Sequence, residues 1–185
     1  MALRSFGVQT LTGVAQPVMS DVTTAAVLVP PSGVDAYITV ASNTFYQVGD
    51  RIVLEPRTTN QDSYRVIAKV TGTGSSSTTV MQCSLEGGSG HAHASGVVIQ
   101  IAIPAIDVVV TPVDGGAGPV FIGADNTVTV SNGGTVCTRL DKTAAGTQAN
   151  AWHMAGGTDH NIVDTAEAWM IGTLADLIYV YALVQ

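Results

Sequence analysis

The sequence has few charged residues. Asp, Glu, Lys and Arg make up 11% of its 185 residues, whereas about 25% is ordinary for a soluble domain. Seven basic side chains stand against fourteen acidic ones, so the formal net charge is −7. Because binding a phosphate backbone requires clustered Lys and Arg, this composition argues against a nucleic-acid-binding protein.

Cysteines, aromatic residues and long apolar runs are also scarce. Two cysteines cannot form a disulfide scaffold. The most apolar stretch, 168–184, contains Gly172, Thr173 and Asp176, whereas a membrane helix needs about 20 continuous apolar residues. The first ten residues hold no apolar run of signal-peptide length. We therefore expect no membrane insertion and no secretory signal.

Apolar residues and glycine are abundant, at 46% and 20 residues respectively. A monomer relies on charged surface to stay dispersed in water. Permanent interfaces, in contrast, are depleted in charge and rich in apolar side chains. The composition therefore favours an obligate oligomer or a component of a larger shell. A β domain of marginal solubility is the alternative.

The residue pattern predicts an all-β fold. Val, Ile and Thr fit pleated strands, and clusters of Gly, Ser, Asn and Asp interrupt the chain at the short intervals typical of β-barrels and β-sandwiches. No segment has a sustained helical period. Residues 1–20 contain Pro17 and little alternation, so we predict an extended N-terminal arm. Two small modules follow, a β-barrel over 21–106 and a β-sandwich over 107–185.

The last predicted strand, 176–184, is apolar on both faces. Such a strand is central in a sheet or covered by another subunit. One face carries Ile178, Val180, Ala182 and Val184. The other face, which we assign to an oligomer interface, carries Leu177, Tyr179, Tyr181 and Leu183.

Only one pair of residues resembles a metal site. His91 and His93 would lie on the same side of a strand and could share a zinc ion. Neither Cys83 nor Glu86 has a spacing that supplies the missing ligands. The favoured alternative is a corner between a loop and a strand, where histidines cap backbone groups. We therefore predict no metal site.

Catalytic motifs are missing as well. The segment 87–91 (GGSGH) lacks the order of a nucleophile elbow, and no phosphate-binding loop is present. A pair of carboxylates for glycoside hydrolysis stays open, because such residues lie far apart in sequence. We predict no catalytic residue, no cofactor and no enzymatic activity.

Several segments resemble parts of small structural proteins of tailed bacteriophages. Residues 4–18 (RSFGVQTLTGVAQPV) resemble the N-terminal segment of such proteins. A small β-barrel module of these proteins is similar to residues 45–52 (FYQVGDRI), 64–66 (YRV) and 93–98 (HASGVV). A second phage module resembles residues 118–123 (GPVFIG), 125–129 (DNTVT) and 168–172 (AWMIG).

The resemblance implies a capsid decoration (cement) protein, which binds the outer surface of the phage head. It implies the major capsid protein as partner, a homotrimer, and a location on the virion surface after synthesis in the bacterial cytoplasm. His93 would be structural, in the turn that closes the first barrel. The arm would bind the capsid through Arg4, Phe6, Val8, Leu11 and Pro17.

Two further functions stay open from the sequence. One is another virion component, in the neck, a head spike or the tail. The other is a carbohydrate-binding or host-adhesion module, for which Trp152, Trp169 and the tyrosines could supply exposed rings.

Overall fold

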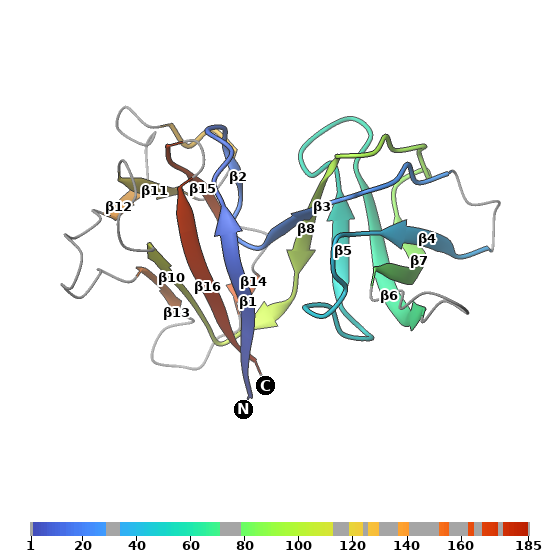
Figure 1. Cartoon of the computed structure of the whole chain (residues 1–185), viewed down its shortest axis with the longest axis horizontal. Coiled ribbons are helices and arrows are strands. Elements are labelled where there is room, and N and C mark those ends of the chain that lie inside the picture. Colours follow the sequence, from blue (N-terminus) through green and yellow to red (C-terminus); the bar gives the residue numbers. More distant parts are fainter. Residues whose placement is uncertain are drawn as a thin grey trace. The chain divides into compact units, whose positions relative to one another are not determined.

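The computed structural model confirms an all-β protein. The residues it describes are 2–28, 34–70, 79–112, 119–123, 126–129, 137–140, 152–155, 163–164, 168–173 and 176–184. All regular structure in these ranges is β. Among the residues described, no helix is long and apolar enough to cross a membrane. The chain divides into two units, Ser20–Ala102, called the barrel unit, and Met1–Met19 with Ile103–Gln185, called the sandwich unit (Figure 1).

The barrel unit is a six-stranded antiparallel sheet that closes on itself. Its sheet order is β3-β8-β5-β6-β7-β4. A bridge between Thr23 and Val40 joins the two outer strands, and the Thr24 N–H donates to the Thr39 carbonyl over 2.8 Å. Closure removes the unpaired edges that an open sheet presents. The strands are β3 (Ser20–Val22), β4 (Ala36–Thr39), β5 (Arg51–Leu54), β6 (Asp62–Val70), β7 (Val80–Gly87) and β8 (Val98–Ala102).

Inward-facing side chains fill the barrel. Burying one large aliphatic or aromatic side chain contributes about 1.5–3 kcal/mol, so this interior is the main stabilising feature of the unit. The side chains, each at most 2% exposed, are Ile38, Ile52, Leu54, Tyr64, Val66, Met81, Cys83, Ile99 and Ile101.

The sandwich unit has two four-stranded antiparallel sheets and one two-stranded ladder. The first sheet, in order, is β1 (Ala2–Thr10), β16 (Leu177–Val184), β10 (Asp107–Pro112) and β13 (Trp152–Ala155). The second is β12 (Cys137–Leu140), β11 (Val120–Gly123), β15 (Trp169–Ile171) and β2 (Gln16–Pro17). The ladder joins β14 (Val163–Asp164) to β9 (Pro104–Ala105). Strands from both ends of the chain therefore build one unit (Figure 1).

The prediction of a separate N-terminal arm is wrong. Residues 2–10 form β1, which pairs with β16 from Ala2↔Val184 to Thr10↔Leu177. The register shifts between Ser5 and Val8, where Gly7 has a φ of +69°. Before the bulge, Arg4 and Phe6 face inward, and after it Gln9 does. The inward positions are therefore not evenly spaced, and the segment shows no regular alternation in the sequence.

The residues assigned to capsid binding accordingly lie within the sandwich unit. Arg4, Phe6, Leu11 and Pro17 are buried, and among the five only Val8 is exposed. The Arg4 guanidinium lies 5.0 Å from the centre of the Phe6 ring. The two units also differ in their bounds from the predicted modules, because residues 1–19 belong to the same unit as residues 103–185.

Candidate functional site

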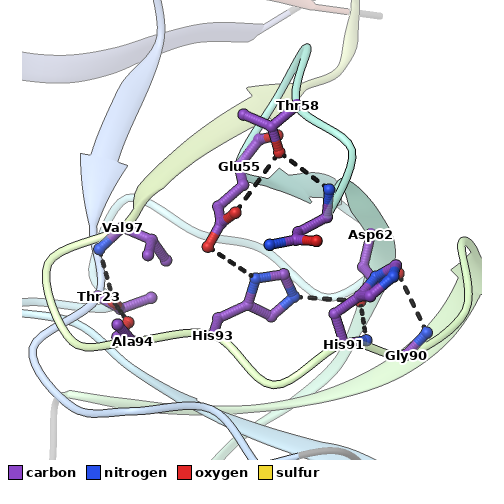
Figure 2. A network of polar contacts seen from close by, with 10 residues as sticks. Thr23, Glu55, Thr58, Asp62, Gly90, His91, His93, Ala94 and Val97 are labelled. Carbon is purple, nitrogen blue, oxygen red and sulfur yellow. Dashed lines mark hydrogen bonds and ion pairs between the residues drawn. The ribbon is translucent and has the colours of Figure 1, made fainter.

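A buried carboxylate, Asp62, organises a polar cluster in the barrel unit. It is the first residue of β6, and its side chain is fully buried. Oδ1 accepts a hydrogen bond from the Gly90 N–H over 3.1 Å, and Oδ2 accepts one from the His91 N–H over 2.5 Å (Figure 2). Asp62 therefore binds the backbone of the segment that follows β7.

Two imidazole rings complete the contacts of this carboxylate. His91 Nδ1 lies 3.2 Å from Asp62 Oδ1, and His93 Nε2 lies 3.1 Å from Asp62 Oδ2. The other nitrogen of His93, Nδ1, lies 3.3 Å from Glu55 Oε1. The buried His93 ring thus stands between two carboxylates (Figure 2). A ring protonated on both nitrogens donates to both of them, whereas a neutral ring donates to one.

Glycine makes the close approach to Asp62 possible. Gly88 has a φ of +100°, and a Cβ there would lie 2.0 Å from Asp62 Oδ1 and 2.8 Å from the Gln61 carbonyl oxygen. Gly90 also has a positive φ, of +68°. The segment 88–91 therefore forms a cradle for a carboxylate, in which Gly88 supplies backbone conformation and space and Gly90 supplies backbone conformation.

The other carboxylate of the cluster is positioned by an unusual backbone conformation. Glu55 has a φ of +47°, which is rare for a residue with a side chain. The Thr58 hydroxyl donates to the Glu55 carbonyl over 2.9 Å, and the Thr58 N–H approaches the same oxygen at 3.2 Å. The turn after β5 thereby holds Glu55 against His93 (Figure 2).

The cluster also lies beside the closure of the barrel. His93 and Val27 exchange two backbone hydrogen bonds of 2.9 Å. The Thr23 hydroxyl donates to the Ala94 carbonyl over 3.1 Å and accepts from the Val97 N–H over 3.2 Å (Figure 2). Asp62, Glu55 and Thr23 together hold a segment with little regular structure, 88–97, against the strands. His93 therefore lies where this segment pairs with Val27, beside the strands that close the barrel.

Hydrogen bonding determines the pKa of Asp62. Burial by itself raises the pKa of this carboxyl. The N–H groups of His91 and Gly90 and the two imidazole rings outweigh burial and hold the pKa below 3.8. The ionised form of Asp62 is therefore favoured by folding.

The barrel unit is expected to lose stability in acid through Asp62. A carboxyl whose pKa is lowered by folding stabilises the protein fully above its unfolded pKa, and this stabilisation is lost as the pH falls through the folded pKa. The free energy of unfolding should therefore fall as the pH drops below 3.8, and less steeply in Asp62→Asn. Urea unfolding followed by far-UV circular dichroism across the acid range measures both slopes.

The difference between the wild-type protein and Asp62→Asn isolates the contribution of the Asp62 carboxyl to the pH dependence of stability. Burial raises the pKa of Asp21, so this carboxyl contributes a pH dependence of the opposite sign. That contribution is the same in both proteins and cancels in the difference. Parallel curves of stability against pH for the two proteins would contradict the assignment.

The histidines engage carboxylates and do not converge on a common point. Their rings lie edge to face, with centroids 6.5 Å apart. Within the described residues, no three His, Cys, Asp or Glu side chains form a group that could hold a metal ion. Cys83 lies in the barrel interior, and Glu86 pairs with Arg65. The two histidines thus contact carboxylates, whereas Cys83 and Glu86 have other surroundings.

The Cys83 thiol is expected to be unreactive in the folded protein. Burial, together with the nearby Asp35 carboxylate, raises its pKa to about 12, and the thiolate is the reactive form. Iodoacetamide at mildly alkaline pH should leave Cys83 unlabelled until urea unfolds the barrel. Mass spectrometry of the Cys83 peptide reads this directly, and rapid labelling of the native protein would contradict the packing.

A second candidate site is an apolar surface on the sandwich unit. Ile178, Val180 and Ala182 of β16 are fully buried. The alternate residues of the same strand face outward, with Leu177 39% and Tyr179 38% exposed. The neighbouring strands extend this surface through the cross-strand pairs Leu3↔Leu183, Val8↔Tyr179 and Val109↔Tyr181. We call the set the outer apolar face: Leu3, Val8, Val109, Leu177, Tyr179, Tyr181 and Leu183.

The four residues assigned to an oligomer interface therefore share one outward face. Tyr179 and Tyr181 stack, with ring centroids 6.3 Å apart and an interplanar angle of 24°. Asp107 is the only acidic or basic residue at an outward position of β1, β10 and β16. Leu3 and Val8 belong to this surface because residues 2–10 form β1 and not a separate arm. Val109 belongs to it through the non-local pairing of β10 with β16.

The tryptophan proposed for sugar binding lies in the core. Trp169 is 4% exposed and packs with Phe121, Val128 and Ile171. The side chain of Trp152 lies outside the described residues. Sugar-binding sites use aromatic rings that solvent can reach, so the buried Trp169 is not available to the carbohydrate-binding function for which Trp152, Trp169 and the tyrosines were considered.

Comparison with protein-family models, curated protein sequences and solved structures gives no match to this chain.

Proposed function

We propose that this chain is a non-enzymatic structural protein of a tailed-phage virion. Its role would be that of a capsid decoration (cement) protein, which binds the outer surface of the head and stabilises the shell. The observation that carries the proposal is the outer apolar face in a chain with 11% charged residues. Exposed apolar surface of this kind marks a site of protein contact, as an assembly subunit requires.

The polar cluster supports a structural role as well. Asp62 and His93 are buried, and their polar atoms bind one another, Glu55 and the backbone. A catalytic acid or base must reach a proton on its substrate, and buried groups engaged in this way hold loops together. The partner in the proposal is the major capsid protein, and the working form is a homotrimer on the virion surface.

The capsid contact must differ from a free N-terminal arm. Because Phe6 and Leu11 are buried in the sandwich unit, they are not available to a shell. The proposal therefore places the contact on surfaces of folded units, with many copies on a lattice supplying avidity.

Sedimentation with phage shells tests the proposal. The purified chain is mixed with shells assembled from the major capsid protein encoded in the same genome. We expect saturable co-sedimentation that unlabelled chain competes away, and a higher temperature of shell disruption when the chain is bound. Co-sedimentation with isolated tails or necks, without binding to shells, would move the chain to another part of the virion. No binding to any of them would overturn the proposal.

A further inference from the structure

We infer that the outer apolar face is the surface through which copies of this chain bind one another. The inference deepens the proposed function by naming the partner at this face. It can be tested without a capsid.

The outer apolar face is continuous across three strands. Each cross-strand row contains one residue from β1, one from β16 and one from β10. The first row is Leu3, Leu183 and Asp107, and the second is Ser5, Tyr181 and Val109. The third row runs Val8, Tyr179, Thr111. Directly opposed side chains on one face of an antiparallel sheet touch, so the rows form one surface. Apolar and tyrosine side chains occupy most of it.

The charge distribution favours a second copy as the occupant. The chain carries a net charge of −7, so two copies repel each other at long range. The outward positions of β1, β10 and β16 add little to this repulsion, because among them only Asp107 is a charged residue and it lies in the row at one end. A partner of opposite charge would find few groups to pair with on this face. A second copy brings the same uncharged surface.

The residue types fit the centre of a protein interface. Interface cores are depleted in charged residues and enriched in tyrosine, whose ring buries apolar area while its hydroxyl stays hydrogen-bonded. Tyr179 and Tyr181 are already stacked, so little side-chain freedom is lost when a second copy covers them. In this arrangement β1 contributes Leu3 and Val8 to contacts between subunits.

Light scattering after size-exclusion chromatography tests the inference on the intact chain. The wild-type protein should have a mass of two or more times 19.0 kDa. Tyr181→Asp and Val8→Asp each place a charge in the contact and should shift the mass to that of a monomer. Because Val8 is 49% exposed, its substitution leaves the core of the unit intact. Far-UV circular dichroism verifies that each variant is folded.

Tyr37→Asp is the matched control. Tyr37 lies in β4 of the barrel unit and is 57% exposed, so the same chemical change is made on a strand outside the face. This variant should keep the wild-type mass. A monomeric wild-type protein, or folded face variants that retain its mass, would overturn the inference.

The stoichiometry separates this inference from the proposed function. A trimer supports both. A dimer supports the face as the self-association surface and contradicts the trimer of the proposal. Self-association without any shell binding would leave the inference standing and overturn the proposed function.

Discussion

Asp62→Ala is expected to lower the unfolding free energy of the barrel unit by about 3–5 kcal/mol, because it leaves buried partners uncompensated. The N–H groups of Gly90 and His91 and the ring of His93 all lose an acceptor. Domains are stable by about 5–15 kcal/mol, so much of the stability of this unit would be lost.

Two probes separate the units in this experiment. Both tryptophans, Trp152 and Trp169, lie in the sandwich unit, so tryptophan fluorescence reports that unit. Far-UV circular dichroism reports both units. In Asp62→Ala the urea midpoint should fall in the circular dichroism signal and change little in the fluorescence.

Asp35→Ala provides the matched control for Asp62→Ala. The Asp35 carboxylate is partly exposed and accepts one hydrogen bond, from Gln82 Nε2 over 2.7 Å. Removing it should cost about 1 kcal/mol, the ordinary contribution of a single hydrogen bond. If the Asp62 and Asp35 variants unfold at the same urea concentration, the Asp62 cluster does not hold the barrel together.

Gly88→Ala should destabilise the barrel unit by several kcal/mol. Alanine in the left-handed region costs about 1–2 kcal/mol by itself. At Gly88 the added Cβ also meets Asp62 Oδ1 at 2.0 Å and the Gln61 carbonyl oxygen at 2.8 Å. The segment must move, and the hydrogen bonds of Gly90 and His91 to Asp62 are lost with it. Urea unfolding followed by circular dichroism measures the effect.

Gly49→Ala separates backbone strain from the clash. Gly49 has a φ of +97°, close to that of Gly88, and a Cβ there meets nothing within 4 Å. Its substitution should therefore cost only the backbone term of about 1–2 kcal/mol. Equal losses in the two variants would show that Gly88 serves the turn alone and that its closeness to Asp62 is unimportant.

The sequence predicts a strand well where an apolar, β-branched segment continues without interruption. The last strand is predicted over 176–184, and β16 is observed over Leu177–Val184. In β1 the bulge at Gly7 changes which residues face inward, so a real strand reads as an unpatterned arm. Its pairing with β16, at the other end of the chain, is a non-local contact that no local pattern contains.

The sequence identifies the polar cluster only in part, because the contacts within it are also non-local. The pair of histidines stands out in the sequence, but their partners lie 29, 31 and 38 residues away. Asp62 follows a turn, where Asp is common for local reasons. The glycine-rich segment before His91 is the one local indication of a close approach to Asp62, and the same composition is also typical of a flexible loop. Folding alone brings Glu55, Asp62 and His93 together.

Chemical modification of tyrosine tests most directly whether the outer apolar face is covered in the working protein. Acetylation by N-acetylimidazole, read by peptide mass spectrometry, is measured on concentrated protein and after dilution. Tyr37, exposed on the barrel unit, is the internal control. We predict that Tyr179 is protected in concentrated protein and becomes reactive on dilution, whereas Tyr37 reacts equally in both. A Tyr179 that reacts like Tyr37 at every concentration would contradict the account.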